Sequence, residues 1–166
     1  CGNSSNTEQT GEAKSAGLQI GYGRANVTPD FSVGIGGYSD NETRRSEGFL
    51  DYLYATCIAV TEGEETLLII NTDNLAMSAG NLKQVRAYVT QATGIAEDRI
   101  LAYATPTHSA PSITTADEAG KKYMDLFYSG CAEAAKAALE GAAGYNRFLV
   151  GAPQYLVLLT ASSDLA

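Results

Sequence analysis

Residues 67–103 read LLIINTDNLAMSAGNLKQVRAYVTQATGIAEDRILAY, and this stretch decides the fold. It opens on a continuous apolar run, Leu67-Leu-Ile-Ile-Asn71, which predicts a buried strand. Apolar residues then recur at helical spacing over 78–93, and Gly94 is typical of a helix end. Arg99-Ile-Leu-Ala-Tyr103 predicts a second strand. The order strand, helix, strand predicts a βαβ unit with parallel strands and a right-handed crossover.

Further elements are expected on both sides of this unit. They are a first strand at 18–22, a strand at 52–60, a turn at 62–65 that joins it in a hairpin to 67–71, a second helix at 119–140 and a last strand at 155–160. The glycine-rich, charged segment 32–48 predicts an irregular loop. Because 67–71 is apolar throughout, we expect burial on both of its faces. The sequence therefore predicts an α/β fold, a mixed β-sheet with at least one parallel βαβ unit and flanking helices.

Composition excludes several classes of function. The chain has 166 residues, a net charge of −8 and only 11 scattered Lys and Arg residues, so nucleic acid is not an expected partner. No apolar run reaches the roughly 20 residues of a membrane helix. The oligomeric state is not predicted. Cys57 and Cys131 lie among apolar residues, which predicts buried, inert thiols.

The first 17 residues differ from the rest of the chain. They are small and polar with almost nothing to bury, so we expect residues 1–17 to be a disordered tether before a domain at 18–166. A chain that begins with Cys1 and a polar tether resembles a mature bacterial lipoprotein, lipidated on that cysteine. This resemblance implies anchoring to a membrane surface, outside the cytoplasm, in the bacterial cell envelope. The alternative is an arbitrary start that happens to be cysteine.

Two polar loops follow the two strands of the βαβ unit. One carries Asp73 and the other, Thr105-Pro-Thr-His-Ser-Ala-Pro111, holds the only histidine of the chain, His108. Ligands of open α/β sheets bind at the carboxyl ends of parallel strands, so Asp73 and His108 are expected in one cleft. We predict catalytic roles for these two residues. The expected substrate-binding hydroxyls belong to Thr105, Thr107 and Ser109.

A purely structural role remains open for both loops. His108 could be satisfied by neighbouring backbone, and Asp73 could cap the helix that follows it. A serine-nucleophile triad is disfavoured, because Gly-x-Ser-x-Gly is absent and adjacent His and Ser side chains rarely point at each other.

Four blocks, in order, resemble the N-terminal part of the neutral ceramidases. They are Gly21-Tyr-Gly-Arg-Ala-Asn-Val-Thr-Pro29 with Gly36-Gly-Tyr38, Glu47-Gly-Phe-Leu-Asp-Tyr-Leu-Tyr-Ala55, Leu68-Ile-Ile-Asn-Thr-Asp-Asn-Leu75, and the loop 105–111, which is similar to the family's Thr-His-Thr-His-Ser-Gly-Pro signature. The resemblance extends to about residue 140, and the tail beyond it diverges.

This resemblance implies hydrolysis of the amide of ceramide to sphingosine and a fatty acid, with a zinc ion that activates water. His108 matches the second histidine of the signature, and Asp73 matches the aspartate after the buried strand. Pro106 stands where the family has a zinc histidine, and no other histidine exists in this chain. We therefore expect no metal site, and a chain that is incomplete or inactive alone. The alternative is a non-catalytic surface lipoprotein that keeps the fold and binds a lipid or amide ligand.

Overall fold

The fold was analysed in a computed structural model, which describes residues 17–38, 44–113, 117–144, 148–152 and 155–159. Its elements, in chain order, are β1 (Gln19–Asn26), β2 (Tyr54–Glu62), β3 (Glu65–Thr72), α1 (Ala79–Thr93), the short 3-10 helix η1 (Glu97–Arg99), β4 (Ile100–Ala104), α2 (Glu118–Glu140), β5 (Ala143–Gly144), β6 (Phe148–Ala152) and β7 (Tyr155–Leu159). The predicted tether, apart from Gly17, and Cys1, the predicted site of lipidation, lie outside the described residues.

The main sheet has the order β4-β3-β2-β1-β5. β3 and β4 are parallel and joined by α1, while the other neighbours are antiparallel. The predicted α/β class and the βαβ unit are therefore confirmed. The predicted β2–β3 hairpin is also present, and Gly63 supplies a positive φ of 60° at its turn. β6 and β7 pair with each other in a separate two-stranded sheet, and the sequence had indicated only the second of them.

Both helices begin and end where local chemistry dictates. The Ser78 side chain accepts a hydrogen bond from the Asn81 N–H at the start of α1, and Gly94 ends that helix with a φ of 77°. Asp117 caps α2 in the same way by accepting from the Gly120 N–H. The predicted bounds, 78–93 and 119–140, agree with these helices to within one residue. Neither helix is long and apolar enough to cross a membrane, and the described residues contain no other candidate span.

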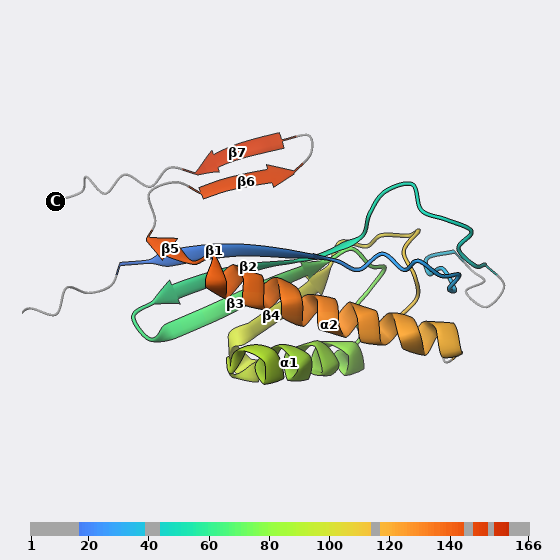
Figure 1. The fold of residues 1–166 in the computed structure, drawn as a ribbon, viewed down its shortest axis with the longest axis horizontal. Helices are drawn as coiled ribbons and strands as arrows, with labels where there is room; N and C mark the ends of the chain where they lie inside the picture. Colours follow the sequence, from blue (N-terminus) through green and yellow to red (C-terminus); the bar gives the residue numbers. More distant parts are fainter. Residues whose placement is uncertain (1–16, 39–43, 114–116, 145–147, 153–154, 160–166) are drawn as a thin grey trace, which may run out of the picture.

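α1 and α2 lie on the same side of the sheet (Figure 1). Burial along the strands accordingly alternates, with Leu68, Ile70 and Thr72 of β3 inaccessible and the residues between them only half-buried. The expectation that β3 is buried on both faces is therefore wrong, because both helices cover a single face. On the other face Tyr22, Ile58, Ile69 and Leu101 form one row across four strands, and the two outer members are exposed. We call this surface the open face.

The two described cysteines lie on the covered side, in the core. Cys57 of β2 and Cys131 of α2 are fully buried and not joined in a disulfide. Burial raises the pKa of each thiol to about 12. The prediction of buried cysteines is confirmed, and protonated thiols at neutral pH are poor nucleophiles.

α2 approaches β1 unusually closely, through small residues on both elements. A Cβ atom at Gly21 would collide with the Ala138 carbonyl, and one at Gly23 with the Ala134 carbonyl. Gly130 leaves similar room for the Val27 side chain. Because strand backbone meets helix backbone here, no rearrangement of side chains could make space for a larger residue.

We predict that Gly23→Ala lowers the free energy of unfolding by about 2 kcal/mol or more, since the added methyl group forces α2 away from β1. Urea denaturation followed by circular dichroism measures this. Gly48→Ala is the matched control, because a Cβ there meets no atom within 4 Å, and it should change stability by less than about 0.5 kcal/mol. Equal effects of the two substitutions would contradict the close-packing account.

Candidate functional site

The two polar loops that follow β3 and β4 are joined by a buried hydrogen-bond network. Thr105 N–H donates to the Thr72 carbonyl, and Thr107 N–H donates to the Asn74 carbonyl, both at 3.0 Å. The Thr72 hydroxyl donates to Asn74 Oδ1 at 2.5 Å, and the amide group of Asn74 donates to the Ala76 carbonyl at 2.6 Å. Both side chains are inaccessible to solvent, so the network holds the loops rigidly at one sheet edge.

Asp73 lies at this junction and contacts both β2 and the second loop. Its Oδ2 accepts from the Tyr54 N–H at 3.0 Å, and its Oδ1 accepts from the Thr105 hydroxyl at 3.1 Å. The hydroxyls of Thr105 and Thr107 are 3.2 Å apart. The structure thus brings Asp73 together with Thr105 and Thr107, as the strand order predicts.

His108 is directed to a different neighbour. Its Nδ1 lies 2.9 Å from the Gly37 carbonyl, and its ring meets Tyr38 edge-on at 5.7 Å between centroids. Because a carbonyl oxygen only accepts, Nδ1 carries the proton in this bond. Gly37 has a φ of 100°, and a Cβ there would collide with the His108 backbone. His108 therefore holds Gly37 and Tyr38 against the loop 105–111, to which it belongs.

A pocket of about 960 Å³ opens beside Asp73. Three chain segments line it together with Asp73: residues 28–32 with Ile35, residues 46–53, and residues Thr107, Ser109 and Pro111. His108 is not among the lining residues, although its two neighbours in the chain are. The catalytic and binding roles predicted for these residues stay predictions.

The lining combines apolar and acidic side chains. Phe31, Ile35, Phe49 and Leu53 supply apolar surface, and the carboxylates are those of Asp30, Glu47, Asp51 and Asp73. The described lining contains no Lys, Arg or His. Such a pocket suits a ligand that is largely apolar and carries neutral or positively charged hydrogen-bond donors.

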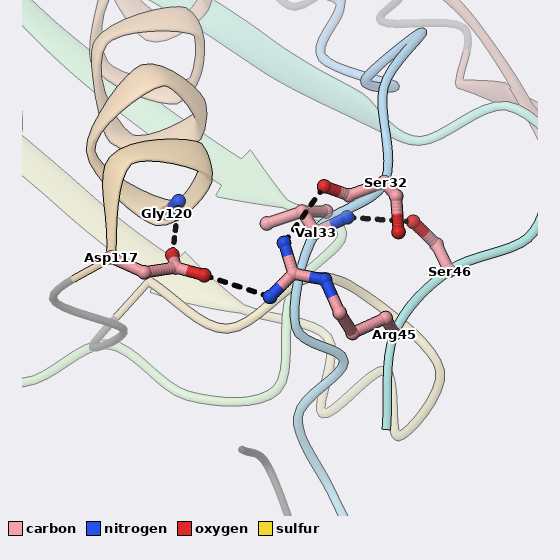
Figure 2. A network of polar contacts seen from close by, with 6 residues as sticks. All are labelled: Ser32, Val33, Arg45, Ser46, Asp117 and Gly120. Carbon is pink, nitrogen blue, oxygen red and sulfur yellow. Dashed lines mark hydrogen bonds and ion pairs between the residues drawn. The ribbon is translucent and has the colours of Figure 1, made fainter. Parts of the chain in front are cut away.

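One wall of the pocket is held by an ion pair at the start of α2 (Figure 2). Arg45 bonds Asp117 at 2.7 Å and donates a second hydrogen bond to the Ser32 carbonyl at 3.0 Å. The hydrogen bond from Arg45, followed by that from the Gly120 N–H, lowers the pKa of the Asp117 carboxyl. The Ser46 hydroxyl accepts a hydrogen bond from the Val33 N–H at 3.0 Å, which joins the two wall segments to each other. The segments at 28–35 and 46–53 are thus tied to α2.

Sequence reasoning did not assign these two segments to the site. They have no periodic pattern, and 32–48 had indicated only an irregular loop. The available signal was the resemblance of residues 47–55 to a ceramidase block, which marked part of the pocket wall without giving it a role.

The residues present do not fit a zinc ion. Catalytic zinc takes about three protein ligands. His108 has its Nδ1 bonded to Gly37, Pro106 has no donor side chain, and the described residues contain no group of three His, Cys, Asp or Glu side chains that could hold a metal. The zinc of the resembling family is therefore not assigned to residues of this chain.

The geometry defines a class of protein: a mixed α/β domain with a pocket beside Asp73, which follows the carboxyl end of β3. The neutral ceramidase from Pseudomonas aeruginosa has this fold, with a TM-score of 0.68 and 21% identity over 80% of this chain and 23% of that one. A ceramidase complexed with C2 matches with a TM-score of 0.67 and 21% identity, over 80% of this chain and 22% of that one. The chain thus spans less than a quarter of either structure.

No protein-family model matches the sequence, and no curated protein matches it. The likeness to ceramidases therefore rests on the fold. The resemblance predicted from the four sequence blocks is confirmed at this level.

We predict that the purified chain carries far less than one zinc ion per molecule, measured by elemental analysis after dialysis. Pro106→His should raise zinc affinity only modestly, since the loop would then offer two histidines without the remaining ligands. Stoichiometric zinc in the unmodified chain, lost in His108→Ala, would contradict the conclusion that this chain has too few ligands for zinc.

Proposed function

We propose that this chain is a ceramidase-like domain that binds the amide of an N-acyl lipid in the pocket beside Asp73. The observation that carries the proposal is the pocket itself, whose lining combines apolar side chains with the Asp73 carboxylate and the hydroxyl side chains of Thr107 and Ser109. The ceramidase fold supports the same class of ligand.

Each part of the pocket suits one part of such a ligand. The apolar side chains of Phe31, Ile35 and Leu53 bury the acyl chain, which contributes about 0.8 kcal/mol per CH₂ group. The Asp73 carboxylate has lone pairs beyond the two hydrogen bonds it already accepts, so it takes the amide N–H. The Ser109 hydroxyl donates to the amide carbonyl, because the single hydroxyl proton of Thr107 is already directed at Thr105.

The pocket also selects against other lipids. A free fatty acid would bring its carboxylate close to four lining carboxylates, which repel it. An N-acyl amide is neutral and offers a donor to Asp73. The proposal therefore predicts preference for the amide over the fatty acid of equal chain length.

Hydrolysis by this chain alone is not part of the proposal, because its residues do not fit the metal that activates water in the resembling family. In this proposal His108 positions Gly37 and Tyr38, and Asp73 holds the ligand. Anchoring to a membrane through a lipid on Cys1 belongs to the proposal as well, and mass analysis of the native N-terminus tests it.

Calorimetric titration with a short-chain, water-soluble N-acyl sphingoid tests the proposed function. We predict saturable binding to the wild-type chain and about tenfold weaker binding to Asp73→Asn, because a charge-assisted hydrogen bond becomes a neutral one. The substitution is nearly isosteric, and one amide oxygen can still accept from Tyr54 or Thr105.

Asp98→Asn is the matched control, since Asp98 lies in η1, away from the pocket-lining residues, and is exposed. It should bind as the wild type does. Absence of binding to the wild type, or equal affinities for the amide and the matching fatty acid, would overturn the proposed function.

A further inference from the structure

The segment at residues 47–52, which we call the rim loop, projects from the mouth of the pocket. Both of its ends are fixed: Ser46 exchanges hydrogen bonds with Val33, and Leu53 exchanges them with Thr28 and Val27. The ends of the rim loop therefore have a defined position. Its central residues are exposed, as Leu50 shows most clearly.

The tip of the rim loop is apolar and faces solvent. Leu50 is 98% exposed, Phe49 55% and Tyr52 54%. The Phe49 and Tyr52 rings lie 5.1 Å apart, and Tyr52 lies 6.3 Å from Tyr54 at the start of β2. Single exposed apolar residues are ordinary, but three within four positions around a pocket mouth indicate an interaction surface.

Charges around the tip narrow the choice of partner. Glu47 and Asp51 flank the apolar side chains in the sequence, and Asp30 also lines the pocket. Three cations near these segments each contact another side chain: Arg45 pairs with Asp117, Lys122 lies over the Phe31 ring at 3.9 Å, and Arg24 lies over the Tyr54 ring at 4.2 Å. An anionic surface would therefore be repelled, while a surface without net charge would accept both the apolar tip and the carboxylates beside it.

We propose that the rim loop docks on a zwitterionic phospholipid bilayer, with Phe49 and Leu50 inserted below the headgroups and Tyr52 at their level. Aromatic residues prefer this interfacial depth, and burial of apolar side chains drives the insertion. The charge pattern favours this occupant over an anionic membrane, and continuity with the pocket favours it over a partner protein. Docking would bring the pocket to the membrane surface. The role of this docking in delivering a lipid to the pocket rests on the proposed function.

A single-tryptophan variant tests this directly, because the chain contains no tryptophan. Phe49→Trp should show a blue-shifted emission with phosphatidylcholine vesicles, and quenching by lipids that carry a quencher in the upper acyl chain. The full chain with an unacylated Cys1 is used, so that no lipid anchor contributes. Tyr103→Trp on the open face is the matched control and should show neither change.

Vesicle co-sedimentation gives the second readout. Leu50→Asp should weaken binding to phosphatidylcholine vesicles about tenfold or more, whereas Leu101→Asp on the open face should not. Adding phosphatidylglycerol to the vesicles should weaken binding of the wild type.

These measurements contain no amide ligand, so their failure is distinguishable from failure of the proposed function. Three results would overturn the docking proposal. The first is no emission shift in Phe49→Trp, and the second is an equal loss of vesicle binding in Leu50→Asp and Leu101→Asp. The third is a wild-type dimer in sedimentation analysis that becomes a monomer in Leu50→Asp. The last would show that a second copy of the chain covers the rim loop.

Discussion

The close contact between α2 and β1 is the constraint on which the rest of the structure depends. Gly21 and Gly23 admit the backbone of α2 at Ala134 and Ala138, and a larger residue at either glycine has no room. This contact fixes the C-terminal half of the helix, residues 130–138, against β1 and the residue that follows it, and Asp117 lies at the start of the same helix. Asp117 holds Arg45, and Arg45 holds the Ser32 carbonyl in the wall of the pocket. A packing restraint in the core thus determines the shape of a site at the edge.

The second wall of the pocket depends on the sheet itself. The parallel pair β3 and β4 delivers two loops to one edge, where buried Thr72 and Asn74 tie them together. Asp73 is held between them with both oxygens engaged. A carboxylate fixed in this way at the edge of an apolar pocket is suited to recognition of a donor such as an amide N–H. The ceramidase structures that share the fold are roughly three and a half times as long as this chain, because 80% of its 166 residues covers only 22–23% of them, so recognition and catalysis need not reside in the same part of such a protein.

Periodicity in the sequence was enough to predict both helices and the strands β1 to β4 and β7, but not β5, β6 or η1. Residues 67–103 predicted the βαβ unit correctly, because strand and helix periods leave distinct patterns. The apolar run at 67–71 led to a wrong expectation of burial on two faces, since a strand's sequence does not tell how many layers cover it. The position of Asp73 followed from strand order. The bond from His108 to Gly37 could not be predicted, because it depends on a φ of 100° in a loop without periodic pattern. The pocket wall was missed for the same reason.

The central claim is that the edge formed by these loops, and not the open face of the sheet, is where the chain binds its ligand. Nitrogen-15 amide chemical-shift mapping during titration with a soluble N-acyl sphingoid tests it most directly. The account predicts saturating shifts at Asp73 and at the non-proline residues of 28–35, 46–53 and 107–111. Shifts confined to Tyr22, Leu101, Tyr103 and their neighbours on the open face would contradict it.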